Sequence, residues 1–166
     1  MTIAVVVLAG GEGSRIGGGK PIRLLGGKRL IDRAMEAACS WSGVVAVAVR
    51  EAGQLGATGL CDIVDDPSID GPLGGLASGL RFAAEFGCRH LLTIPADMPF
   101  LPADLQPRLA AGIADAGAAI AASGGSLHPV CALWLVSGLG LLPDYLETGR
   151  RSLKGFAEAV EMRSVV

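Results

Sequence analysis

Apolar residues recur in this chain in short, nearly unbroken runs separated by turns rich in glycine or proline. The first run covers Thr2 to Ala9, and others follow over Val44 to Val49, Cys61 to Val64 and His90 to Ile94. Runs of this length that are rich in β-branched residues are typical of strands buried on both faces of a sheet. We therefore expect the first half of the chain to form a buried, mostly parallel sheet.

Segments with apolar residues three and four positions apart alternate with these strands. Ile31, Ala34, Met35 and Ala38 have this helical spacing. The full pattern predicts helices over Leu30–Trp41, Leu73–Phe86 and Pro102–Asp115, strands over Ala118–Ala122, Val130–Leu135 and Met162–Val166, and helices over Leu139–Val160 broken near Gly149. Such alternation predicts an α/β fold, a Rossmann-like three-layer sandwich with a mostly parallel sheet.

Composition narrows the class of protein further. A chain of 166 residues suits a single domain over 1–166, and 51% hydrophobic with only 4% aromatic residues suits helices packed closely on a buried sheet. A net charge of −2 without a Lys/Arg run predicts no nucleic-acid partner and no attraction to an anionic membrane. The sequence has no visible export signal and no C-x-x-C pair among its four cysteines, so we expect a cytoplasmic protein without a zinc site.

The loop after the first strand, LAGGEGSRIGGGKP over residues 8–21, combines six glycines with Arg15 and Lys20. Glycines let the backbone approach a ligand closely, and their N–H groups form anion-binding concavities. The two cations would supply full charge to phosphates. The spacing fits neither the Walker A pattern nor G-x-G-x-x-G. We interpret the loop as a phosphate-binding site, the alternative being a surface loop without a ligand.

Acidic residues follow two of the predicted strands. Asp97 lies just past a buried strand, where open α/β sheets place their ligands, and a carboxylate there suits Mg²⁺; a turn or helix-capping role is the alternative. Asp65, Asp66 and Asp70 precede the glycine-rich turn GPLGGL, whose N–H groups suit a base edge or a phosphate, although some of these acids must be solvated turn residues. His128, next to Pro129, is a candidate for the acceptor side of the site.

Four motifs in this order, LAGGEGSRIGGGKP, DDPSIDGPLGGLASGL, IPADMPFLP and HPVCALW, resemble those of the molybdenum cofactor guanylyltransferases over about the first 135 residues. The resemblance implies the nucleotidyltransferase fold, with GTP as co-substrate and Mg²⁺ as cofactor. It implies a phosphorylated pterin, the molybdopterin-bound cofactor, as acceptor, and transient contact with molybdenum cofactor proteins. It also implies nucleotide binding by the residues that match the motifs, namely Leu8, Ala9, Gly10, Gly11, Lys20 and Asp66, and Mg²⁺ binding by Asp97.

The catalytic roles follow from the chemistry of such a transfer. A phosphate-monoester acceptor is already anionic at pH 7, so it needs no general base. Catalysis then consists of aligning two anions and neutralising charge, the roles predicted for Lys20, Arg15 and Asp97.

Two departures from the family pattern keep alternatives open. Ala46 to Arg50 has no Asn at the strand end, and an Asn-rich C-terminal segment linked to pterin binding is not present before Val166. The alternatives are a cytidylyl- or sugar-phosphate nucleotidyltransferase on the same fold, or a nucleotide-binding module without turnover.

Overall fold

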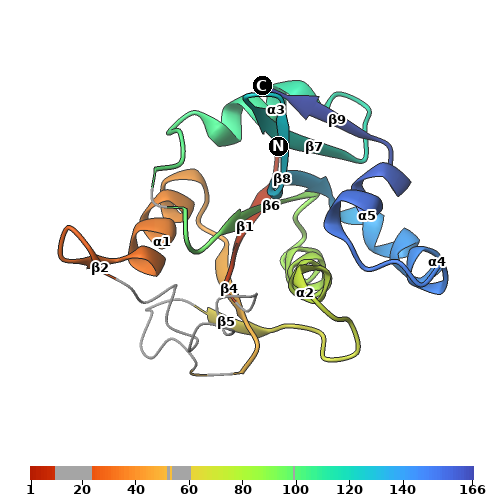
Figure 1. Cartoon of the computed structure of the whole chain (residues 1–166), viewed down its shortest axis with the longest axis horizontal. Coiled ribbons are helices and arrows are strands. Elements are labelled where there is room, and N and C mark those ends of the chain that lie inside the picture. The colour runs from red at the N-terminus through yellow and green to blue at the C-terminus, as the bar shows by residue number, and fades with distance from the viewer. Residues whose placement is uncertain (10–23, 52, 54–60, 99) are drawn as a thin grey trace.

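The computed structural model describes residues 1–9, 24–51, 53, 61–98 and 100–166. Within these residues, seven strands form one twisted sheet in the order β5-β4-β1-β6-β8-β7-β9 (Figure 1). The strands are β1 (Ile3–Leu8), β4 (Val45–Val49), β5 (Cys61–Val64), β6 (His90–Pro95), β7 (Ala118–Ser123), β8 (Ser126–Leu135) and β9 (Met162–Val165). Every described pairing in this sheet is parallel except those that β8 makes with its neighbours β6 and β7. The predicted, mostly parallel sheet is thereby confirmed.

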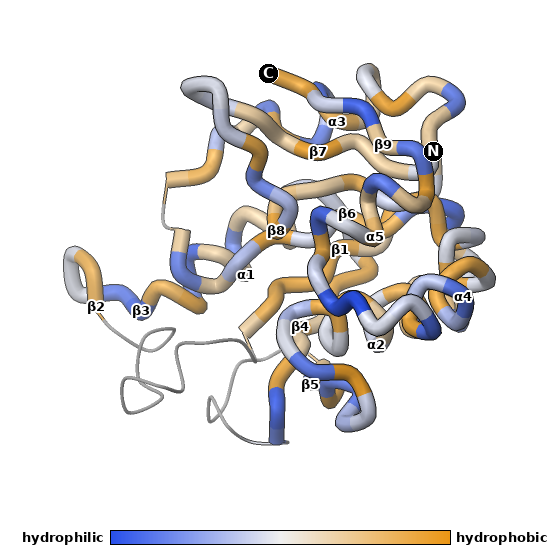
Figure 2. Tube along the Cα trace, turned by 45° about the vertical axis from the view of Figure 1, so that its right-hand side comes forward, coloured by the Kyte–Doolittle hydropathy of each residue, from blue (hydrophilic) through white to orange (hydrophobic). Residues whose placement is uncertain are grey.

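Helices cover both faces of the sheet, as the predicted three-layer sandwich requires. One face carries α1 (Leu30–Trp41) and α3 (Leu105–Ile113), and the other carries α2 (Pro72–Glu85), α4 (Leu142–Glu147) and α5 (Leu153–Ala159) (Figure 1). Alternate strand residues enter opposite clusters: Val5 and Val7 pack with α1 and α3, whereas Ala4 and Val6 pack with α2, α4 and α5. This alternation follows from the two-residue period of a strand, and it explains why the inner strands are apolar throughout (Figure 2).

The predicted elements match the structure closely where the periodicity is strong. Helix α1 spans Leu30–Trp41 and buries the four residues singled out by their spacing. The last predicted helical segment, Leu139–Val160, is broken at Gly149, whose φ is 83°. Its first three residues belong to a 3₁₀ helix, η3 (Val136–Leu141), rather than to an α-helix. No described helix is long and apolar enough to cross a membrane.

Three features differ from the predicted elements. A hairpin of two-residue strands, β2 (Leu24–Leu25) and β3 (Lys28–Arg29), lies outside the main sheet. Helix α3 is shorter at both ends than expected. Strand β8 begins four residues earlier than expected, because the register shift between Ile120 and Ala121 accommodates Pro129, which cannot donate to a regular ladder.

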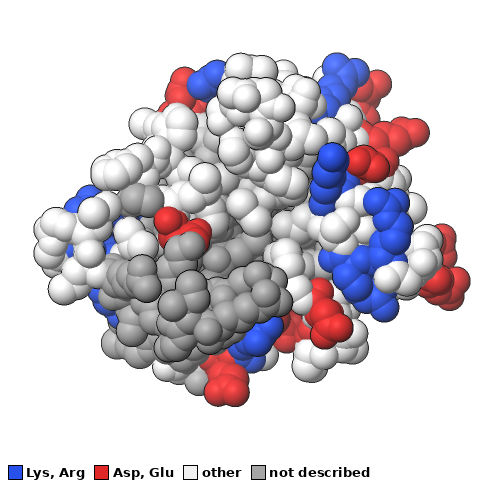
Figure 3. Space-filling view, in the orientation of Figure 1, with Lys and Arg blue, Asp and Glu red and all other residues white. Residues whose placement is uncertain are grey.

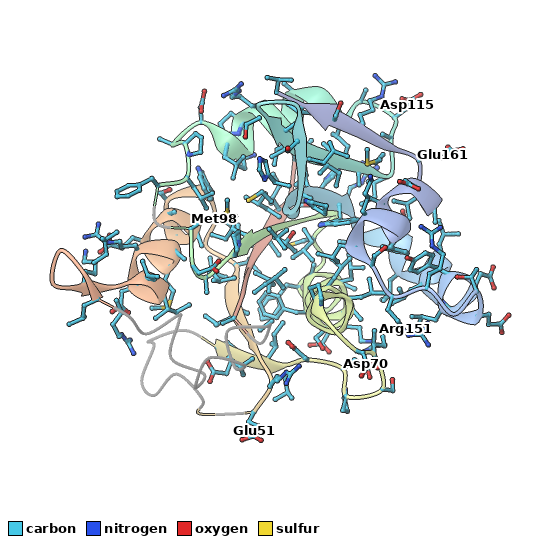
Figure 4. The ribbon with its side chains drawn as sticks, in the orientation of Figure 1. Glu51, Asp70, Met98, Asp115, Arg151 and Glu161 are labelled. Atoms are coloured by element: carbon cyan, nitrogen blue, oxygen red, sulfur yellow. The ribbon has the colours of Figure 1, made fainter. Side chains whose placement is uncertain are left out.

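Charged side chains are spread over the visible surface, with a local gathering of basic ones over α4 and α5 (Figure 3). Some of these cations have structural partners. Arg151 donates through Nη1 to the carbonyl oxygen of Leu146 near the end of α4, and Arg150 lies over the ring of Tyr145 at 5.8 Å. Arg151 projects on the opposite side of the molecule from Met98 in Figure 4, so this basic area lies away from the end of β6.

Candidate functional site

The carboxyl ends of β1, β4 and β6 lie side by side and fix the backbone from which the candidate site is built. Leu8 is in register with Ala48 of β4 and with Pro95 of β6. The N–H of Ala9 donates to the carbonyl oxygen of Ala48 at 2.8 Å, and the N–H of Ala96 donates to that of Leu8 at 3.1 Å. The start of the predicted nucleotide loop is therefore held rigidly at the centre of this edge.

Asp97 lies at the same edge, two residues beyond the end of β6 and next to the end of β1. It is half-buried, and it does not cap α3, whose N-cap position is occupied by Asp104. Its charge acts on a neighbouring thiol: burial first, and the carboxylate of Asp97 second, raise the pKa of Cys131 to about 12. Cys131 is thus a neutral thiol beside an acidic side chain.

Asp66, predicted to bind nucleotide, is held firmly within its own loop. Its Oδ1 accepts hydrogen bonds from the N–H and the hydroxyl of Ser68, at 2.9 and 2.6 Å. Its Oδ2 accepts from Nη1 of Arg81 at 2.9 Å. The Ser68 bonds, together with the ion pair to Arg81, lower the pKa of Asp66 to about 2. The side chain is therefore ionised at neutral pH, and it fastens the loop after β5 to α2.

The preceding residue, Asp65, is in the opposite state. Its Oδ1 is buried and has no hydrogen-bond partner among the described residues, and burial raises the pKa of Asp65 to about 6, an effect that the charge of Arg50 partly offsets. A Cβ built on Gly75 would lie 3.2 Å from this oxygen and 3.1 Å from Cδ2 of Leu8. Glycine at position 75 thus lets the first turns of α2 approach the ends of β1 and β5.

The structure places the predicted site residues as follows. Leu8, Ala9 and Asp97 are brought together at adjacent strand ends, whereas Asp66 follows β5, at the outer end of the same sheet. The remaining candidates fall outside the described residues; these are Gly10, Gly11, Arg15 and Lys20.

The sequence patterns did not identify Ser123 as the hydrogen-bond partner of His128. Oγ of Ser123 lies 2.7 Å from Nε2 of His128, across the hairpin between β7 and β8. The available signal was the Gly124-Gly125 pair, which adopts positive φ values of 55° and 80° and so closes a two-residue hairpin.

The acidic side chains at this edge suit a Mg²⁺ ion that takes only one or two ligands from the protein. They do not suit a metal whose ligands all come from the protein. In the described part of the chain, no group of three or more His, Cys, Asp or Glu side chains is placed to hold a metal. Mg²⁺ needs only one or two protein carboxylates when substrate phosphates and water complete its coordination. Asp97, at a strand end beside the start of the glycine-rich loop, offers such a ligand.

Comparison with solved structures identifies the fold. The fold superposes with a TM-score of 0.77 on molybdopterin-guanine dinucleotide biosynthesis protein A from Archaeoglobus fulgidus, at 24% identity over 97% of this chain and 82% of that one. It superposes with a TM-score of 0.73 on a CMP:2-keto-3-deoxy-manno-octonic acid synthetase, at 14% identity over 99% of this chain and 89% of that one. With Leu8, Ala9 and Asp97 at the carboxyl edge of a mostly parallel sheet, this chain has the fold of the nucleotidyltransferases.

Sequence comparison narrows the class to a family. The model of the MobA-like NTP transferase domain matches residues 5–161. A molybdenum cofactor guanylyltransferase of Cereibacter sphaeroides is 38% identical over 95% of this chain and 81% of its own length. Another, of Acidiphilium cryptum, is 36% identical over 98% of this chain and 83% of its own length. The chain belongs to the MobA-like NTP transferase family, and it is an enzyme of the nucleotidyltransferase type.

Proposed function

We propose that this enzyme transfers GMP from GTP to the phosphate of molybdopterin-bound molybdenum cofactor and releases pyrophosphate. The observation that carries the proposal is the 36–38% identity, over at least 95% of the chain, to relatives named molybdenum cofactor guanylyltransferase. The acceptor is then a phosphorylated pterin. A cytoplasmic location and transient contact with molybdenum cofactor proteins remain predictions from the sequence.

The reaction forms one bond and breaks one. A phosphate oxygen of the acceptor attacks the α-phosphorus of GTP, and the bond between the α-phosphorus and the bridging oxygen to the β-phosphate breaks, so that pyrophosphate leaves with the electron pair. The acceptor phosphate carries roughly 1.5 to 2 negative charges at pH 7, so no side chain has to remove a proton from it. The enzyme's contribution is alignment and charge neutralisation.

The roles we assign to side chains follow from this balance of charge. Arg15 and Lys20, within the glycine-rich loop, would bind the phosphates of GTP, Arg15 as a two-pronged donor and Lys20 as a point charge. Asp97 would hold Mg²⁺, which when bound supplies positive charge to phosphate oxygens. Leu8 and Ala9 would fix the start of that loop, because Ala9 donates to Ala48 of β4 and Leu8 accepts from Ala96, the residue after β6.

Replacement of Asp97 by Asn tests the metal role. Asn retains the shape and one carbonyl oxygen but removes the charge, so we expect a folded variant whose melting temperature no longer responds to Mg²⁺ at fixed GTP. In the wild type, GTP at about 100 times its dissociation constant should stabilise the fold by roughly 2.7 kcal/mol. Thermal shift over a Mg²⁺ titration, together with pyrophosphate release, is the measurement.

Asp115→Asn is the matched control, because Asp115 is an exposed acid paired with Arg163 at 2.8 Å and lies well apart from Met98 (Figure 4). Identical Mg²⁺ responses of the Asp97 variant and the wild type would remove the metal role from Asp97. Stronger stabilisation by CTP than by GTP would overturn the guanylyl assignment.

A further inference from the structure

A cavity of about 530 Å³ opens beside Asp97, between α3 and the β7–β8 hairpin. Much of its lining is apolar, with Leu105 and Leu109 from α3 and Ala121 from β7 among the contributors. Phe100 also lines it and is 80% exposed, an unusual state for a large aromatic side chain. A concave, largely apolar space with an exposed aromatic side chain in its lining is typical of a small-molecule site.

The polar groups of this cavity are few, and two of them form a pair. Ser123 and His128 both line it, and they share the 2.7 Å hydrogen bond between Oγ and Nε2. That bond occupies one ring nitrogen, and Nδ1 then acts as donor or acceptor according to the tautomer. Arg108 lines the cavity too, but its guanidinium is engaged by Asp104 at 3.8 Å and by the main-chain oxygen of Val166.

Asp97 and Met98 line the same cavity, so a ligand that fills it has one end at the predicted metal ligand. The wall next to Asp97 is formed by the sulfur atoms of Cys131 and Met98, which lie 3.8 Å apart. A flat ring with a polar edge fits this sulfur-lined wall better than an anionic group does, because the carboxylate of Asp97 lies beside it. Any anionic group of the ligand would instead lie at the Asp97 end, where a bound cation would compensate it.

We propose that this cavity binds the ring system of the acceptor, with Phe100 against a ring face, the Ser123–His128 pair at the ring edge and the acceptor phosphate at Asp97. The ligand class is a planar, nitrogen-rich fused heteroaromatic carrying a phosphate arm. Aromatic side chains stack on such rings, and a histidine held by a neighbouring hydroxyl presents a fixed hydrogen-bonding group to the edge. The inference rests on the proposed GMP transfer, because it gives the acceptor of that reaction a binding site.

Steady-state kinetics with matched serine variants test the edge contact. We expect His128→Ala and Ser123→Ala to raise the KM for the acceptor, His128→Ala by about tenfold, the effect of losing one good hydrogen bond, while the KM for GTP stays unchanged. Ser126→Ala is the control, because Ser126 is exposed in the same hairpin and is not part of the lining. An equal rise in both KM values, or a Ser126→Ala effect as large as that of Ser123→Ala, would overturn the proposal.

A binding experiment tests the cavity without turnover. Ala121→Leu adds a branched side chain to the lining, so we expect it to abolish quenching of the fluorescence of a free, unphosphorylated pterin that the wild type quenches. The thermal shift given by GTP with Mg²⁺ should persist in this variant and shows that it is folded. Unchanged pterin binding by Ala121→Leu refutes the cavity assignment. A wild type that releases no pyrophosphate with any pterin acceptor refutes the proposed function instead.

Discussion

Two neighbouring carboxylates at the end of β5 are held in opposite electrostatic states. Asp66 has a pKa near 2, because Ser68 and Arg81 stabilise its charged form, whereas burial raises the pKa of Asp65 to about 6. A group whose pKa is raised by folding stabilises the folded state fully only below its unfolded pKa, and that stabilisation is lost as the pH rises through the folded value. Asp65 therefore weakens the fold at neutral pH, and Asp66 strengthens it.

Asp65→Asn should remove this pH dependence. Between pH 4 and pH 6 the wild type should lose less than about 2 kcal/mol of unfolding free energy through Asp65, because solvent screens a carboxyl that is only partly buried, and the variant should not lose it. Urea denaturation of both proteins at a series of pH values measures the difference. Asp66→Asn serves as the contrast, since it should lower stability above pH 4. Parallel pH profiles of Asp65→Asn and the wild type would contradict the assignment.

The loop of Asp66 to Ile69, which follows β5, packs closely against the first turn of α2. The N–H of Asp66 donates to the carbonyl oxygen of Gly74 at 3.1 Å. A Cβ on Gly74 would lie 2.7 Å from the carbonyl oxygen of Ile69 and 3.0 Å from that of Asp66. Because both atoms belong to the backbone, the loop must shift to admit a methyl group.

Gly74→Ala should therefore destabilise the protein by about 1 to 3 kcal/mol, the usual range for overpacking, and should weaken GTP binding. Gly79→Ala in the same helix is the control. Its new Cβ would meet only side chains, Leu91 at 3.0 Å and Val6 at 3.5 Å, and alanine favours a helix by about 1 kcal/mol over glycine. Urea unfolding and GTP titration compare the two variants. Equal unfolding free energies and GTP affinities of the two variants would contradict this prediction and show that the loop shifts at little cost.

The sequence predicted these elements unevenly, for physical reasons. Long apolar runs and helical spacing, as in Leu30–Trp41, carry their own signal. The β2–β3 hairpin has two residues in each strand, too few to show a period. In the candidate site, the place of Asp97 just after a strand could be predicted, and its role as a metal ligand stays a prediction. The opposite pKa shifts of Asp65 and Asp66 could not be predicted, because they depend on how the loop folds Ser68 onto Asp66, on the distant Arg81, and on the burial of Asp65.

At the scale of the whole molecule, the candidate site divides between two parts of one sheet. The described residues predicted to bind nucleotide, Leu8, Ala9 and Asp66, lie at the ends of β1 and β5. The cavity lies against β7 and α3, and β6 with Asp97 stands between the two. Under the proposed assignments, each substrate would have its own supporting strands, and the two substrates would meet at the end of β6.

Amide hydrogen exchange should reveal this division. GTP with Mg²⁺ should slow exchange at the ends of β1 and β5 and in the first turn of α2, because bound ligand suppresses local opening. A pterin should instead slow exchange at the start of α3 and in the β7–β8 hairpin. Exchange in helix α5, which packs on the face of the sheet opposite α3, should change with neither ligand. Protection spread evenly over the molecule by either ligand would contradict the division.

The reversed direction of β8 has a consequence for how such an enzyme can change in evolution. Because β8 runs against β6 and β7, a plain hairpin turn, rather than a strand-to-helix connection, stands at the substrate edge. A hairpin can gain or lose one residue on each arm while every core-facing side chain keeps its face. Changes in the length of this hairpin could therefore alter the proposed acceptor cavity and leave the residues predicted to bind nucleotide unchanged.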